Sequence, residues 1–162
     1  MRQRLWASLF IVGLTIGSVF AQDAAPPSSL AADARIVRVR TGYSAGRCGG
    51  GYCTEITTVE PLFIVWENLD ASDKKRFPDT KAKRTINNQD WENLQRATDT
   101  KSLMALPRPT RCRACVDLPD SWVEVRFSDG TKISVSYDPA NPSAPIAALL
   151  HEIKTLGAKP KH

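Results

Sequence analysis

Histidine is scarce in this sequence: the 162 residues include only His151 and His162. A Ser-His-Asp triad or a His-ligated catalytic metal would need one of these two side chains. His162 is the last residue, and His151 falls about 140° from Ile146 on a predicted helix, opposite that helix's apolar stripe. We therefore predict no catalytic residue, no metal site and no cofactor, and we do not expect an enzyme.

Long apolar segments are almost absent too, because nothing after residue 21 approaches the roughly 20 apolar residues that span a bilayer. At the start, two arginines precede an apolar run over residues 9–17, followed by the small-x-small triplet Val19-Phe20-Ala21. That pattern is typical of a signal peptide, and the run is too short for an uncleaved anchor. We expect a signal peptide over residues 1–21, cleaved after Ala21. The mature chain should be secreted or periplasmic, with no stable membrane insertion.

Neither sign of charge dominates. Without the signal peptide the chain has 20 basic and 17 acidic residues, a net charge of +3. So small an excess does not point to nucleic acid as a partner, and it permits only a weak preference for acidic surfaces. Basic residues gather in residues 74–84, inside a charged stretch (67–84) that we interpret as a loop. A solvated loop explains them more simply than a dedicated site for anionic lipid, glycan or an acidic protein.

The sequence also lacks a phosphate-binding motif. Its glycine-rich stretch, Gly49-Gly50-Gly51, has neither a Gly-Lys-Ser/Thr ending nor a βαβ context. Glycines in such number demand a backbone path that side chains would obstruct. Tyr43 and Tyr52 flank them, either as core residues or as exposed anchors for a partner. We take Tyr43, Gly49, Gly50, Gly51 and Tyr52 as a candidate binding loop.

The four cysteines of the mature chain are the clearest chemical feature present. They are Cys48, Cys53, Cys112 and Cys115. An even number in an oxidising compartment indicates disulfides, and three pairings remain open. A redox pair at the Cys-x-x-Cys motif is the first alternative, but neighbouring prolines place that motif in a loop, not at the start of a helix. A four-thiolate zinc site is the second alternative, with which oxidation competes.

Paired carboxylates could in principle serve a glycosidase. The acidic candidates are Glu55, Glu60, Glu67, Asp117 and Asp120. Nothing in their spacing selects a pair, so surface charge is the simpler interpretation.

Alternation and periodicity predict an α+β fold. Strands are expected at residues 35–41, 52–59, 62–66, 121–127 and 131–137, with helices at 90–98 and 143–156. An Asp-Gly turn at 129–130 makes the last two strands a hairpin. Asn87 resembles the start of a capping box, with Asp90 three residues later. The order β-β-β-α-β-β-α predicts an antiparallel sheet with helices packed on one face. We expect a disordered leader over 22–34, one domain over 35–157 and a frayed tail over 158–162.

This layout resembles an uncharacterised exported bacterial family and emfourin, a family of small inhibitors of thermolysin-like metalloproteases. The resemblance covers most of residues 35–156. Its motifs are Arg40–Gly46 after the first strand, Ala97–Pro107, the hairpin around Asp129-Gly130, and the helix Pro145–Leu156. The cysteines depart from emfourin, residues 67–84 look like an insertion, and no inhibitory residue can be transferred. The resemblance implies a fold and, less directly, protease inhibition.

We therefore expect an exported, disulfide-stabilised monomer that binds an unknown protein, with a protease as one candidate partner. Its contact surface would be the glycine-rich loop or the basic residues 74–84. Two alternatives stay open: a thiol-disulfide redox protein that uses Cys112 and Cys115, and an envelope-associated structural protein.

Overall fold

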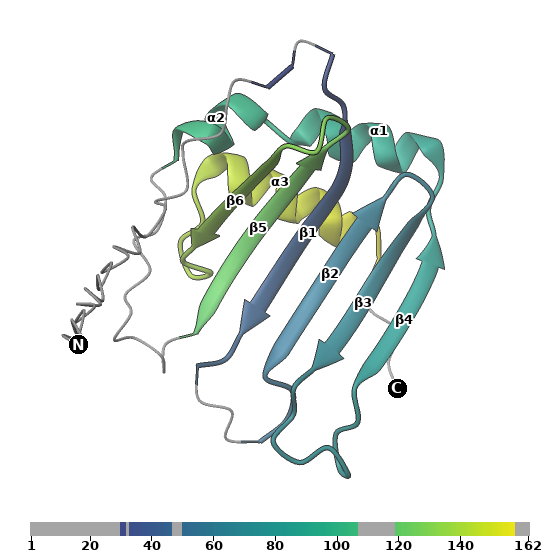
Figure 1. Ribbon diagram of the computed structural model, residues 1–162, viewed down its shortest axis with the longest axis vertical. Coiled ribbons are helices and arrows are strands. Elements are labelled where there is room, and N and C mark those ends of the chain that lie inside the picture. The colour runs from purple at the N-terminus through teal and green to yellow at the C-terminus, as the bar shows by residue number, and fades with distance from the viewer. Residues whose placement is uncertain (1–29, 32, 47–49, 107–118, 158–162) are drawn as a thin grey trace, which may run out of the picture.

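An antiparallel sheet organises the part of the chain that the structure describes (Figure 1). The computed structural model describes residues 30–31, 33–46, 50–106 and 119–157. Its strands are β1 (Ile36–Ser44), β2 (Thr54–Glu60), β3 (Phe63–Leu69), β4 (Thr80–Thr85), β5 (Asp120–Phe127) and β6 (Lys132–Tyr137). They lie in the order β4-β3-β2-β1-β5-β6. Strands β1 to β4 form a meander outward from β1, and the β5–β6 hairpin returns to the other side of β1.

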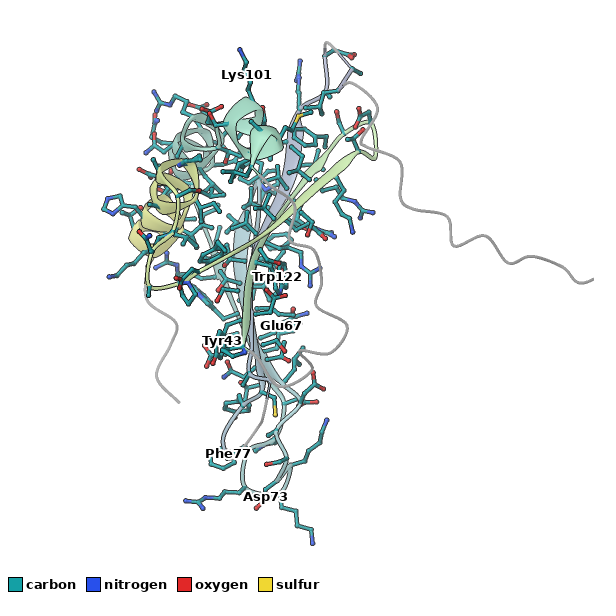
Figure 2. All side chains as sticks on the ribbon, turned by 90° about the vertical axis from the view of Figure 1, so that its left-hand side faces the viewer. Tyr43, Glu67, Asp73, Phe77, Lys101 and Trp122 are labelled. Atoms are coloured by element: carbon teal, nitrogen blue, oxygen red, sulfur yellow. The ribbon has the colours of Figure 1, made fainter. Side chains whose placement is uncertain are left out.

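Helices pack on one face of this sheet, as predicted. They are α1 (Asn88–Ala97), α2 (Thr100–Ala105) and α3 (Ala144–Thr155). Figure 2 shows the sheet edge-on, with the helices gathered on one side of its upper part. We name the opposite side of the sheet the open face, because no helix of the described part of the chain lies on it. None of the described helices is long and apolar enough to cross a membrane.

Alternation along the strands decides which side chains enter the core. Cross-strand neighbours share a face, so Val39 of β1 lies with Val59 of β2 and Val125 of β5 beneath the helices. All three are completely or almost completely buried. The remaining core comes from both layers: Ile64, Trp66, Ile86, Trp91, Leu94, Leu103, Val123, Phe127, Ile133, Val135, Ile146, Leu149, Ile153 and Leu156.

The predicted capping box at Asn87 and the predicted glycine after the last helix are confirmed, although α1 begins at Asn88, two residues earlier than expected. The Asn87 side chain accepts from the amide of Asp90 at 2.8 Å, and the Asp90 carboxylate accepts from the Asn87 amide, so the capping box is complete. Helix α3 buries Ile146, Leu149 and Ile153 and is followed by Gly157, whose φ is +113°. That left-handed conformation suits glycine at the end of a helix.

The charged loop expected over residues 67–84 is wrong at both ends. Strand β3 continues to Leu69, and residues 80–85 form the edge strand β4. Lys81 and Lys83 lie on the open face of β4. Ala82, between them, is the only apolar residue of the strand. Charged side chains on an edge strand prevent it from pairing with other chains. They also make the composition of the strand resemble that of a loop.

The short helix α2 was also missed. It begins at the N-cap Asp99, whose side chain accepts from the Ser102 amide at 3.0 Å, and Leu103 is its buried residue. One buried side chain gives too little periodicity to be detected.

The structure describes only the C-terminal end of the predicted leader. Leu30 and Ala34 pack against the core, although they belong to the stretch expected to be disordered. The predicted signal peptide and the predicted C-terminal tail lie outside the described residues.

Candidate functional site

The two segments proposed as contact surfaces meet at one end of the sheet. We name this part the loop end: the β1–β2 connection (residues 45–53, of which 45–46 and 50–53 are described) and the β3–β4 connection (residues 70–79). The amide of Ala45 donates to the carbonyl of Cys53 at 2.7 Å, and the amide of Cys53 donates to the carbonyl of Leu69 at 3.2 Å. These bonds extend the sheet hydrogen bonding across three strands into the base of the loops.

Tyr52 joins one loop to the other. Its hydroxyl donates to the carbonyl oxygen of Pro78 at 3.0 Å. Its ring meets Phe77 edge-on, with 5.8 Å between the ring centres. An aromatic contact of this geometry stabilises by about 0.5–1.5 kcal/mol beyond the area it buries. The Tyr52 side chain therefore anchors the β3–β4 connection to the glycine-rich loop.

Two aspartates hold the β3–β4 connection in shape. One carboxylate oxygen of Asp79 accepts from the Asp70 amide at 3.1 Å, and the other accepts from Lys74 Nζ at 3.1 Å. Asp73 Oδ1 accepts from the amides of Lys75 and Arg76, at 3.1 and 3.2 Å. Short polar side chains that bind backbone amides a few residues on are characteristic of tight turns.

A basic tip results from these bonds. We name Lys74, Lys75 and Arg76 the basic tip, and all three side chains are exposed. Phe77 follows the tip, and its amide donates to the Asp73 carbonyl at 2.8 Å. Figure 2 shows Asp73 and Phe77 well beyond the part of the sheet that the helices cover. The tip therefore projects from the molecule on a turn that its own hydrogen bonds stiffen.

The structure separates some residues that we had grouped in the candidate binding loop. Tyr43 belongs to β1, where it pairs with Glu55 and Ser121, and its side chain is 41% exposed on the helix side of the sheet (Figure 2). Gly50 and Gly51 have φ values of +142° and +94°, which L-residues rarely adopt. Tyr52 is half-buried in its contact with the other loop. Gly49 lies outside the described residues.

Of the cysteines, the structure describes Cys53, which carries no free thiol. Cys48, Cys112 and Cys115 lie outside the described residues, so the disulfide pairing remains a prediction.

A hollow of about 340 Å³ lies on the open face. Its floor is the cross-strand pair Thr58 and Val65, two small side chains at the centre of β2 and β3. Longer side chains surround them: Arg38, Arg40, Glu60, Phe63, Glu67 and Lys81. The hollow exists because short side chains neighbour one another where the surrounding positions all carry long ones.

Ion pairs and aromatic contacts fix the walls of this hollow. Arg38 pairs with Glu60, and Lys81 Nζ lies 2.9 Å from Glu67 Oε1. On the other side of β1, the guanidinium of Arg40 lies 5.4 Å from the ring centre of Trp122. Such a cation–π contact contributes about 0.5–1 kcal/mol at an exposed site. The open face thus mixes aromatic and charged side chains.

The acidic and histidine candidates do not form a catalytic group in the described residues. Glu60 and Glu67 both line the hollow, but each is paired with a cation, and Glu55 faces the helix side. Asp120 begins β5, and Asp117 lies outside the described residues. His151 is exposed on α3, as predicted. No group of three or more His, Cys, Asp or Glu side chains within the described ranges could hold a metal ion.

The groups with shifted pKa values lie away from both the loop end and the hollow. Hydrogen bonds from the Ser102 side chain and amide lower the pKa of Asp99 at the start of α2. In the β5–β6 turn, the Thr131 amide donates to Asp129 and lowers its pKa. Burial raises the pKa of Tyr137 at the end of β6. These shifts reflect local structure at a helix start, a turn and a strand end.

Trp122, Arg126 and Lys132 were missed as surface residues, although the alternation that identified β5 and β6 places them all on the open face. No family model matches the chain, and no curated protein matches it.

Proposed function

We propose that this protein is a non-catalytic binding domain that contacts a partner protein through the loop end. The observation that supports this proposal is the set of hydrogen bonds by which Asp73 and Asp79 bind backbone amides inside the projecting β3–β4 connection itself. Ordering an interface side chain or loop on binding costs about 0.5–1.5 kcal/mol for each side chain immobilised. A loop that is ordered before binding avoids much of that cost.

The charge of the tip indicates what it would meet. The carboxylates of Asp73 and Asp79 are engaged within the loop, whereas Lys75 and Arg76 extend from it exposed. Arg76 lies over the Phe77 ring, with 5.3 Å from its guanidinium carbon to the ring centre. The proposed partner therefore presents acidic groups around a recess that accepts the tip.

Position-specific photo-crosslinking tests this proposal. A photoreactive amino acid replaces Lys75 at the tip in one variant and His151 on the exposed side of α3 in the control. Each variant is expressed in the cells that naturally produce the protein. We expect a covalent adduct with a protein from position 75 and none from position 151. No adduct from position 75, or equal adducts from both positions, would contradict the proposal.

Protease inhibition is the more specific form of the proposal. A stiff convex loop can occupy a protease cleft, and the resemblance to emfourin suggests thermolysin-like metalloproteases. The test measures residual peptidase activity with micromolar wild-type protein and with a Lys75→Ala, Arg76→Ala variant. We expect inhibition that the variant loses. If no metalloprotease is inhibited, this form fails, while the crosslinking result still decides the general one.

A further inference from the structure

A row of like charges crosses the open face at one end of the hollow. The strand register places Arg38 of β1 directly opposite Arg126 of β5, and Arg126 directly opposite Lys132 of β6. We name these three residues the basic row. Like charges directly opposite each other in an antiparallel sheet are destabilising. Glu60 pairs with Arg38 and Glu124 pairs with Lys132 at the two ends of the row, so an anion bound over Arg126 would relieve the repulsion that remains.

In each ion pair of the open face, the carboxylate lies deeper than its cation. The Glu124 side chain is 17% exposed, whereas its two partners, Lys132 and Arg40, are 54% and 31% exposed. Likewise Glu60 is 21% exposed and its partner Arg38 is 38% exposed. Glu67 and Lys81 follow the same order, at 23% and 66%. A molecule that approaches the open face therefore meets positive charge first.

The hollow adds a place for an uncharged group. It adjoins the basic row through Arg38, which belongs to both, and Thr58 and Val65 form its floor. The Phe63 ring stands at its edge, and Lys83 Nζ lies 3.7 Å from the centre of that ring. A volume of about 340 Å³ accommodates one large side chain with room for water.

The mixture of charges identifies the class of partner. A uniform polyanion, such as a sulfated glycan, would meet three carboxylates among the cations of this face. A polypeptide can place carboxylates over the basic row and other groups over the glutamates. Arginine and tryptophan are enriched at protein interfaces, and Arg40 with Trp122 supplies that pair here.

From these features we infer that the open face binds an acidic segment of a protein, with carboxylates over the basic row and one large side chain in the hollow. This inference rests on the proposed protein-binding function and adds a second surface with a defined partner chemistry. It uses none of the residues of the loop end, so the two surfaces can be tested separately.

Charge reversal at Arg126 is the decisive variant. The probe is a glutamate-rich synthetic peptide with one central tryptophan, titrated into the mature protein by calorimetry. Lys154→Glu is the control, because Lys154 is exposed on α3 and its reversal changes the net charge by the same amount. We expect Arg126→Glu to weaken peptide binding by about tenfold or more and Lys154→Glu by less than about twofold. The Arg126→Glu variant should fold at least as stably as wild type, because the new carboxylate would lie between the like charges of Arg38 and Lys132.

Three results would overturn the inference. Equal weakening by both variants would mean that only the net charge matters. Tighter binding of a heparin oligosaccharide than of the peptide, lost in Arg126→Glu, would make the face a polyanion site. No peptide binding to the wild-type protein would leave the face without the inferred ligand. None of these results changes the crosslinking expected at the basic tip, so failure here is distinguishable from failure of the proposed function.

Discussion

Replacing Gly42 by alanine should show how closely the open face is packed. A Cβ atom at this position would lie 2.2 Å from Cζ2 of Trp122, because the indole lies over the glycine of the neighbouring strand. Carbon atoms in contact are separated by about 3.5–4.0 Å, so the ring would have to move by about 1.5 Å. Overpacking of this kind costs about 1–3 kcal/mol. Gly42→Ala should therefore lower the free energy of unfolding by that amount.

The same substitution should stabilise the fold when the indole is absent. Glycine within a strand is less favourable than alanine by roughly 0.5–1 kcal/mol. In a Trp122→Ala background the clash is gone, so Gly42→Ala should stabilise the fold by that amount. The coupling between the two positions should then be about 1.5–4 kcal/mol, as expected for residues in direct contact.

Urea unfolding followed by far-ultraviolet circular dichroism measures all four members of this cycle without depending on the tryptophan that is removed. Additivity of the two substitutions to within about 0.5 kcal/mol would refute the reasoning, because it would show that the indole does not lie over Gly42.

Three further outcomes are expected. Asn87→Ala removes the side-chain bond that caps the Asp90 amide, although the backbone amide at position 87 can still donate to Asp90, and it should lower stability by about 1 kcal/mol; Asn88→Ala, one residue later, should have a much smaller effect in the same unfolding assay. Tyr52→Phe keeps the ring but removes the bond to the neighbouring loop, so amide exchange should quicken in residues 70–79 and not in the core; unchanged exchange there would count against the anchor. Hydrogen bonds with Ser102 lower the pKa of Asp99, so its contribution to stability is present above its ordinary value of 3.8 and is lost as the pH falls below it. Asp99→Asn should flatten that acid dependence, and identical pH profiles would argue against it.

Much of this fold follows from local pattern. The β5–β6 hairpin combines strict alternation with an Asp-Gly turn, and both signals act over a few residues. Helix α3 has a continuous apolar stripe and a glycine after its last turn. In each case one buried face and one turn residue specify the element, so no knowledge of its neighbours is needed.

The edge strand β4 shows why the rest could not be predicted. Its lysines, Lys81 and Lys83, face solvent on the open side, and its place in the sheet comes from pairing with β3. That pairing is a long-range interaction that composition does not reveal, because edge strands carry charge for their own protection.

The loop end and the open face could not be predicted without the register of the strands. Both contact loops were recognised from composition, but their contact through Tyr52 and Phe77 depends on β2 and β3 being neighbours. The hollow and the basic row depend on which residue stands opposite which across three or more strands. A shift of one residue in any pair would move these side chains to the other face.

The most direct test of the central claim is competition for crosslinking from the basic tip. The variant with a photoreactive residue at position 75 is illuminated in the cells that naturally produce the protein. These cells also contain an excess of a competitor chain without the photoreactive residue. One competitor is the wild-type chain, and the other is a chain in which Lys74, Lys75 and Arg76 are all alanine. The account predicts that the wild-type chain abolishes the protein adduct and that the alanine variant leaves it. Equal competition by both chains would contradict binding through the loop end.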